Sequence, residues 1–225
     1  MFNRLEKIIG SNNLNKIKET TVMVVGIGGV GGYVVEGLIR SGISNIIIID
    51  HDKVDVTNKN RQIIALNSTI GRKKVDVMKD RILDINENCK VEVLDIFLDE
   101  SNTEEIIKKY NSDYVVDACD TITTKKKIIT TCLKNDIKFI SSMGTGNKLD
   151  PTRLMISDIR KTSYDPLAKI LRKWVKDEKI VGKIPVLWSD EVPIETHDRT
   201  PGSTSFVPSS AGLIIVSYII NDIIK

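Results

Sequence analysis

The sequence is poor in cysteine, in aromatic residues and in charge of one sign. Its 225 residues include three cysteines and 5% aromatics, and 33 basic residues against 30 acidic ones leave a net charge of +3. Cys89, Cys119 and Cys132 form no C-x-x-C pair, which argues against structural zinc and against a disulfide framework. The balanced charge gives no global field typical of a nucleic-acid-binding protein, so any such surface must be local.

Long hydrophobic runs are also missing. The amino terminus has no apolar stretch of signal-peptide length, so we expect no export, and the scattered cysteines suit a reducing, cytoplasmic setting. The apolar run at 211–220 is shorter than the roughly 20 residues that span a bilayer. We interpret it as a buried closing helix and expect no integral membrane span; a peripheral membrane anchor is the alternative.

Strands and helices alternate along the predicted chain. Strands are expected at 21–25, 46–50, 91–95, 114–117 and 137–141, with helices at 5–18, 29–41, 72–88, 103–110 and 123–135. This alternation predicts an α/β fold of the Rossmann-like, doubly wound type, with a mostly parallel sheet covered on both faces. Right-handed crossovers then bring the carboxyl ends of the strands to one edge, where we expect the chemistry.

The rhythm changes after residue 150. We assign 1–150 to a nucleotide-binding core that includes an amino-terminal helix, and 151–225 to a C-terminal extension of the same domain. The extension is expected to add strands at 153–158 and 185–189, a basic helix at 165–176, a crossing loop at 191–208 and the closing helix.

A glycine-rich segment, G-I-G-G-V-G, begins at Gly26 directly after the first strand. In a nucleotide-binding loop Gly26 allows a sharp turn, Gly28 and Gly29 leave room for a phosphate, and Gly31 lets the helix pack closely on its strand. N–H groups at the helix start attract an anion. Asp50 follows about twenty residues later, the usual distance for a carboxylate that binds ribose hydroxyls. The pattern predicts a nucleotide site, with a structural glycine turn as the alternative.

The segment D-H-D-K-V-D-V-T-N-K-N-R-Q, from Asp50 to Gln62, is rich in hydrogen-bonding groups. Asn58 and Arg61 are three residues apart, so in a helical segment they would share a face and reach a triphosphate. Lys74 opens a predicted helix against its dipole, which is unfavourable unless an anion is near. The segment therefore favours phosphate contact, although without the glycine loop a solvated surface helix would be the better interpretation.

Two carboxylates lie at the end of the strand Y-V-V-D. Asp117 ends this strand and Asp120 comes three residues later. Carboxylates beside a phosphate site suit Mg²⁺, which prefers oxygen ligands and retains waters. The alternative is that Asp120 caps the next helix, with Thr121 and Thr123 as competing caps, and spacing alone does not separate the two.

Four motifs, G-I-G-G-V-G, D-H-D-K-V-D-V-T-N-K-N-R-Q, G-R-K-K-V and D-A-C-D, resemble in this order the adenylating enzymes of the superfamily of ThiF and the ubiquitin activators. The resemblance implies ATP and Mg²⁺ as cofactors and transfer of AMP to a carboxylate. It implies that Asp50 holds the ribose and that Asp120 handles magnesium. The implied nucleotide-binding set is Gly26, Gly28, Gly29, Gly31, Asp50, Asp52, Asn58, Arg61, Gln62 and Lys74.

The implied catalytic residues are Arg61, Lys74, Asp120 and Arg4. Arg4 enters this set because N-R-L-E-K-I-I-G resembles the opening of these enzymes, in which an arginine reaches the ATP of the partner subunit in a homodimer.

The second half narrows the resemblance. S-S-M-G-T-G-N-K-L-D-P-T, D-P-L-A-K-I-L-R and G-S-T-S-F-V-P-S-S-A-G-L resemble the tRNA threonylcarbamoyladenosine dehydratases of this superfamily. That branch implies a tRNA substrate, whose threonylcarbamoyladenosine next to the anticodon is cyclised with ATP through adenylation of its carboxylate and intramolecular ring closure. AMP and pyrophosphate are then released. A sulfur-relay protein would be an additional partner.

Other functions remain open at this point. An adenylyltransferase for the Gly-Gly carboxylate of a small sulfur-carrier protein is the first alternative, and an NAD-dependent oxidoreductase would share the glycine loop and Asp50. No cysteine follows Cys132, which excludes a thioester relay through the crossing loop. tRNA would need a basic surface, for which 160–183 and 124–127 are candidates, with Trp174 and Trp188 as stacking residues; solvated helix faces and core packing are the alternatives.

Overall fold

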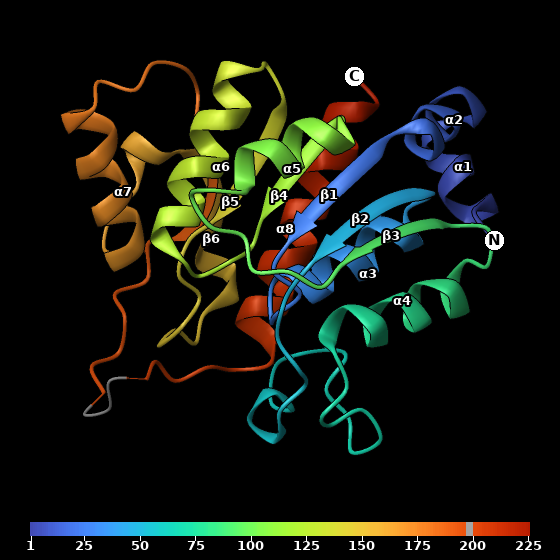
Figure 1. The fold of residues 1–225 in the computed structure, drawn as a ribbon, viewed down its shortest axis with the longest axis horizontal. Coiled ribbons are helices and arrows are strands. Elements are labelled where there is room, and N and C mark those ends of the chain that lie inside the picture. Colours follow the sequence, from blue (N-terminus) through green and yellow to red (C-terminus); the bar gives the residue numbers. More distant parts are fainter. Residues whose placement is uncertain (197–199) are drawn as a thin grey trace.

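The computed structural model describes residues 1–196 and 200–225. A seven-stranded sheet runs through the centre in the order β3-β2-β1-β4-β5-β7-β6 (Figure 1). β6 pairs with β7 in antiparallel orientation, and the other neighbouring pairs are parallel. The strands are β1 (Thr21–Val25), β2 (Asn45–Ile49), β3 (Lys90–Leu94), β4 (Tyr114–Asp117), β5 (Lys138–Ser142), β6 (Leu154–Asp158) and β7 (Pro185–Ser189).

Helices cover both faces of this sheet. One face carries α3 (Gly31–Arg40), α4 (Lys74–Ile85) and α8 (Phe206–Ile223), and the other carries α5 (Thr103–Tyr110), α6 (Ile122–Lys134) and α7 (Pro166–Asp177). Short 3₁₀ turns lie at η1 (Val56–Asn58), η2 (Pro151–Arg153) and η3 (Ile159–Lys161). This arrangement confirms the predicted Rossmann-like, doubly wound α/β fold with added strands and a closing helix.

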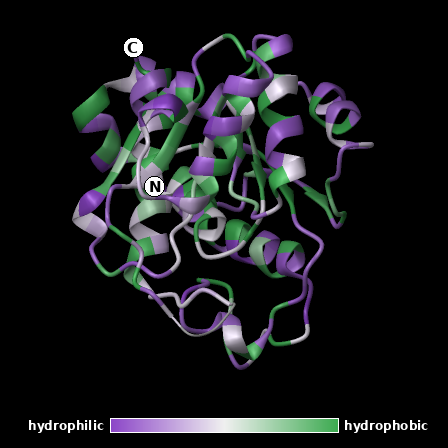
Figure 2. Cartoon of the chain, turned by 90° about the vertical axis from the view of Figure 1, so that its left-hand side faces the viewer, coloured by the Kyte–Doolittle hydropathy of each residue, from purple (hydrophilic) through white to green (hydrophobic). Residues whose placement is uncertain are grey.

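The central strands read as continuous apolar runs because both of their faces are buried. In β1, Val22 and Val24 join the core under α3 and α8, whereas Met23 and Val25 join the core under α5 and α6. Figure 2 shows hydrophobic residues concentrated in the interior and hydrophilic ones on the outward sides of the helices.

The closing helix α8 lies against α3 at very short range. A Cβ on Gly212 would approach the Val30 carbonyl oxygen to 2.7 Å, and one on Gly37 would approach Val216 to 2.8 Å. By length and composition α8 is a candidate membrane span, the one such helix in the described residues, yet eight of its residues are buried in the core. That burial agrees with the predicted closing helix.

The predicted boundaries differ most from the structure at three elements. The single helix expected at 5–18 is two, α1 (Asn3–Ile9) and α2 (Ser11–Glu19), separated by Gly10 with φ 79°. The helix expected at 72–88 ends at Ile85. Pro208 lies inside the first turn of α8, where its missing N–H costs no helical hydrogen bond, so the predicted crossing loop is shorter. Residues 197–199 of that loop lie outside the described residues.

Candidate active site

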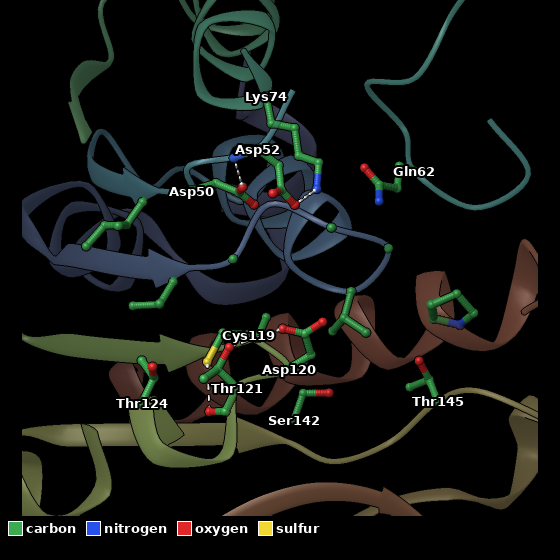
Figure 3. A pocket seen from close by; sticks show the side chains of 18 of the residues that line it. Asp50, Asp52, Gln62, Lys74, Cys119, Asp120, Thr121, Thr124, Ser142 and Thr145 are labelled. Atoms are coloured by element: carbon green, nitrogen blue, oxygen red, sulfur yellow. Dashed lines mark hydrogen bonds and ion pairs between the residues drawn. The ribbon is translucent and has the colours of Figure 1, made fainter. Parts of the chain in front are cut away.

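A pocket of about 380 Å³ opens at the carboxyl edge of the parallel strands. Figure 3 shows two walls: Asp50, Asp52 and Lys74 on one side, and Asp120 and Ser142 on the other. The pocket is lined by every residue of the predicted nucleotide-binding set except Gly31, which is the first residue of α3. The pocket therefore lies where the sequence predicted it, at the edge of the sheet formed by the carboxyl ends of the parallel strands.

The glycine loop has the geometry that the sequence predicted. Gly26 has φ +88°, and a Cβ there would lie 2.8 Å from the Ala118 carbonyl oxygen, which confirms the sharp turn. A Cβ on Gly31 would lie 1.8 Å from the Gly26 oxygen, which confirms the close approach of helix and strand. Gly28 faces open space, with nothing nearer to its Cβ position than Gln62 Nε2 at 3.9 Å.

The start of α3 is open toward this pocket. Its N-cap residue is Val30, whose side chain accepts no hydrogen bond from the first N–H groups of the helix. Both Gly29 and Val30 line the pocket. Backbone N–H groups at an uncapped helix start, together with the helix dipole, make a binding site for an anion such as a phosphate.

Asp50 forms hydrogen bonds with both the glycine loop and the segment that follows β2. Its Oδ2 accepts the Ile27 N–H at 2.7 Å and its Oδ1 accepts the Asp52 N–H at 2.9 Å. The residue is 8% exposed and lines the pocket. Each carboxylate oxygen has lone pairs to spare, so Asp50 can still accept hydrogen bonds from ligand hydroxyls.

Lys74 is buried at the first position of α4, and its Nζ lies 2.7 Å from Asp52 Oδ2. The anion that the sequence required near this lysine is thus supplied within the chain. Burial raises the pKa of Asp52, but the hydrogen bond and charge of Lys74 outweigh it and hold that pKa below its usual value. The pair fixes the Lys74 side chain at the pocket wall.

The segment after η1 presents Arg61 and Gln62. Arg61 Nη1 donates to the Thr57 carbonyl and to Asn60 Oδ1, both at 2.9 Å, and its stem lies against Gly29. Gln62 is 7% exposed, and its Oε1 is buried with no hydrogen-bond partner in the described residues. An unpartnered acceptor in a pocket wall fits a ligand that brings a donor.

Asn58 is engaged locally. Its Oδ1 accepts the Asp55 N–H at 3.0 Å in a capping box that closes η1. The sequence predicted that Asn58 and Arg61 share one face of a helix. In the structure Asn58 ends the 3₁₀ turn η1 and Arg61 lies three residues beyond it, yet both residues line the pocket.

The two carboxylates at the carboxyl end of β4 lie in different environments. Asp117 is fully buried, bound to Lys125 Nζ at 3.1 Å and to Ser141, so the interpretation of Asp117 as a magnesium ligand was wrong. Asp120 is exposed and lines the pocket. It does not cap α6, whose N-cap is Thr121 with no side-chain capping bond. Of the two acids, Asp120 alone is free to face a cation.

The predicted basic cluster at 124–127 was also wrong. Lys125 is 0% exposed, Lys126 lies over the Trp174 ring at 5.7 Å, and Lys127 pairs with Glu104. Trp188 is buried and donates from Nε1 to Ser157 Oγ, which is the core packing named as its alternative.

No cysteine is activated as a nucleophile. Cys119 lines the pocket, but burial and then the charge of Asp117 raise the pKa of its thiol well above its ordinary value. Burial also raises the pKa of Cys89 to about 11 and that of Cys132 to about 12. Since the thiolate is the reactive form, these cysteines are structural.

Arg4 lies in α1, which precedes the amino end of β1, and it is absent from the lining of the pocket in its own chain. Figure 1 shows α1 and α2 away from the carboxyl ends of the strands.

Apart from Asp120, the residues of the far wall were not predicted as site residues. They include Ser142 at the end of β5, Gly144 and Thr145 after it, Leu167 at the start of α7 and Ser203 from the loop before α8. All five residues lie in motifs that carried the family resemblance, but none was assigned to the site, because uncharged side chains give no direct sign of their role.

Comparisons with known proteins agree with this geometry. The model of the ThiF family matches residues 2–177. The tRNA threonylcarbamoyladenosine dehydratase of Bacillus subtilis is 44% identical over 100% of this chain and 94% of its own length. Structures of the E. coli tRNA N6-threonylcarbamoyladenosine dehydratase in complex with AMP and with ATP superpose with a TM-score of 0.93 at 35% identity, over 99% of this chain and 93% of theirs.

Proposed function

The chain belongs to the ThiF family, in the branch of the tRNA threonylcarbamoyladenosine dehydratases, and from this premise we propose that it uses ATP to cyclise threonylcarbamoyladenosine next to the anticodon of tRNA. The observation that carries the proposal is the pocket itself. A glycine turn, a ribose-type carboxylate at Asp50, a buried ammonium at Lys74 and an unpartnered acceptor at Gln62 line one cavity, in a fold that superposes on a relative solved with ATP and with AMP.

In this proposal the ATP lies along the wall that runs from the glycine loop to Lys74. Asp50 accepts hydrogen bonds from the ribose hydroxyls. Gly28, Gly29 and the open start of α3 face the phosphates. Arg61 and Lys74 neutralise the negative charge that accumulates on them, and Asn58, Asp52 and Gln62 complete the contacts.

The tRNA carboxylate then enters from the far wall. One of its oxygens attacks the α-phosphorus of ATP and pyrophosphate leaves, which gives an acyl adenylate. The carbamoyl group of the same nucleoside attacks the activated carbonyl carbon, closes the ring and expels AMP. Because this second step is intramolecular, positioning supplies much of the rate, and no enzyme nucleophile is required. The raised thiol pKa of Cys119 is consistent with that chemistry.

Asp120 is the residue that would hold Mg²⁺. Its carboxylate is exposed at the pocket and serves no capping role, and oxygen ligands of this kind suit the ion. Magnesium bound there would neutralise phosphate charge.

The assembly is part of the same proposal. The protein acts as a homodimer in which Arg4 of one subunit reaches the ATP of the other, which is supported by the distance of α1 from the pocket of its own chain. We also propose that the enzyme acts on tRNA in the cytoplasm, with a sulfur-relay protein as a further partner. Activation of a sulfur-carrier protein, the alternative, is less favoured because the relatives that match nearly the whole chain at 35% and 44% identity carry the dehydratase name.

The test is a reaction of the purified protein with MgATP and tRNA that carries threonylcarbamoyladenosine. We expect AMP and the cyclised nucleoside to appear in equal amounts by mass analysis, and neither to appear with tRNA lacking the modification. AMP that forms only with a Gly-Gly carrier protein would contradict the proposal and support the alternative.

A further inference from the structure

The helix α7 connects the pocket to a basic, exposed surface. Its first turn contributes Leu167 to the pocket lining. Further along, Lys169, Lys173 and Lys176 are exposed, and their spacing of four and three residues puts them on one face. This lysine face lies opposite the buried side of the helix and extends over about 10 Å at the 1.5 Å rise of an α-helix.

These lysines carry uncompensated charge. Within residues 1–196 and 200–225, none of Lys169, Lys173 and Lys176 forms a salt bridge, whereas Lys125 and Lys127 of the neighbouring helix α6 do. A groove of about 450 Å³ lies at the carboxyl end of α7, lined by Arg160, Arg172, Val175, Lys176, Lys179 and Ile180; of these cations, Arg160 is paired with Asp158. A face on which several cations have no acidic partner attracts a polyanion.

An exposed tyrosine stands at the pocket end of this face. Tyr164 is 63% exposed and has φ 53°, a backbone conformation that bulky side chains rarely adopt. Its neighbour Asp165 is buried, accepts the Ala168 N–H at 2.8 Å and pairs with the buried Lys148 at 3.3 Å. The strained conformation is thus imposed by the buried anchor next to it, and it leaves the aromatic ring in solvent.

The same anchor fixes the position of this ring relative to the pocket. Lys148 also donates to the carbonyl of Gly144, a residue of the pocket wall, at 3.1 Å. A Cβ on Gly144 would lie 3.3 Å from Asp165 Oδ2. Tyr164 does not itself line the pocket, but it directly precedes Asp165, so its backbone is tied through Lys148 to Gly144 of the far wall.

We propose that Tyr164 and the lysine face of α7 bind the anticodon arm of the tRNA substrate, with the tyrosine stacking on a base beside the modified adenosine and Lys169, Lys173 and Lys176 contacting phosphates. Proteins that read single-stranded RNA loops stack unpaired bases on aromatic side chains, and phosphate contacts supply most of the affinity. This inference rests on the proposed function. It replaces the tryptophans considered from the sequence, since Trp188 is buried and the Trp174 ring lies under Lys126.

The first test removes the charges. We measure binding of a purified anticodon-arm RNA to the full-length protein over a range of salt concentrations, which requires no turnover. The triple variant Lys169→Gln, Lys173→Gln, Lys176→Gln should lower the slope of log affinity against log salt by roughly 2 to 3, about one for each phosphate that a lysine no longer neutralises. The matched control removes three exposed lysines elsewhere, by Lys79→Gln, Lys90→Gln and Lys134→Gln, and should leave that slope unchanged.

The second test removes the ring without disturbing the backbone. Asn tolerates positive φ, so Tyr164→Asn keeps the conformation but removes the stacking surface, and it should weaken RNA binding roughly 5-fold to 150-fold. Tyr164→Phe keeps the ring and should bind within about 2-fold of the natural protein, because stacking does not need the hydroxyl. ATP affinity should stay the same in every variant, which shows that the fold and the nucleotide wall are intact.

The outcomes separate this inference from the proposed function. RNA binding that is unchanged in both the triple variant and Tyr164→Asn overturns the RNA surface, even if the natural protein cyclises tRNA normally. The surface is also overturned if these variants bind RNA normally but lose an activity that depends on an acidic protein partner, since the face then docks a protein. Absence of AMP formation by the natural protein with modified tRNA would instead contradict the proposed function.

Discussion

The ammonium of Lys74 lies 2.7 Å from a carboxylate oxygen of Asp52, at the wall of the pocket and at the first position of α4. A cation at a helix start is unfavourable, and its burial adds a desolvation cost. The ion pair with Asp52 offsets both costs and holds the Lys74 side chain in the place where we propose that a triphosphate binds. The sequence shows a lysine at an unfavourable position, the start of a helix, and the structure shows that Asp52 supplies the negative charge that stabilises it.

Replacement of Lys74 should slow AMP formation without unfolding the protein. Lys74→Met keeps most of the volume but removes the charge, and loss of one preorganised electrostatic interaction typically costs about 10²- to 10³-fold in kcat. The measurement is AMP release with modified tRNA, accompanied by thermal unfolding. Lys73→Met is the control, since this exposed neighbour pairs with Asp95 away from the pocket; comparable loss in both variants would count against the assignment.

The pair of Asp117 and Lys125 should behave as a coupled stability element. Both side chains are 0% exposed, and Lys125 also donates to the Ser142 carbonyl at 2.8 Å. Removal of one partner leaves a buried charge unpaired, so Lys125→Met should lower the free energy of unfolding by about 3–5 kcal/mol. Lys125→Met with Asp117→Asn should lose less than the sum of the single variants in urea denaturation. Strict additivity would show that the pair is not coupled.

Stability should fall in acid partly through Glu36. Burial raises the pKa of this carboxyl, but hydrogen bonds from Arg81 and Arg40 outweigh it and lower the pKa below the ordinary value. A lowered folded-state pKa means that the contribution is present above the unfolded value of about 4.3 and is lost as pH falls through the folded one. Glu36→Gln should therefore be less stable at pH 7 and show a smaller loss of stability between pH 5 and pH 3. An unchanged pH slope would show that Glu36 makes no net contribution.

The dimer proposal can be tested by mixing two inactive proteins. If Arg4 serves the partner's pocket, an Arg4→Ala subunit and a Lys74→Met subunit form a heterodimer with one complete site and one site that lacks both residues. Random exchange between equal amounts should restore roughly a quarter of the natural sites. AMP formation after subunit exchange is the readout, and no recovery in confirmed heterodimers would place Arg4 in the pocket of its own chain or outside the site.

The sequence predicted the sheet and the near wall of the pocket because both depend on local patterns. Apolar runs such as that of β2, Asn45–Ile49, mark strands buried on both faces. Gly26 and Gly31 mark backbone approaches that no side chain would permit. Such features can be recognised from a few adjacent residues. The order of the strands then brings them to the carboxyl edge of the sheet.

The features that sequence reasoning missed depend on contacts distant in the chain. Lys125 sits in a run of three lysines that reads as a solvated face, and its burial follows from Asp117 on another element. Lys148 and Asp165 likewise meet only in the fold. The break at Gly10 is a single residue inside an otherwise continuous helical pattern. Pairing of this kind is invisible to periodicity, because each partner alone looks exposed.

The central claim is that AMP is transferred to the tRNA carboxylate in this pocket, and isotope transfer tests it most directly. We would supply the protein with MgATP and tRNA whose threonylcarbamoyl carboxylate carries ¹⁸O at both oxygens, then analyse the released AMP by mass spectrometry. The account predicts one ¹⁸O atom in the phosphate of each AMP formed, since the carboxylate oxygen that attacks phosphorus leaves with the nucleotide. AMP without label, formed alongside the cyclised nucleoside, would contradict it.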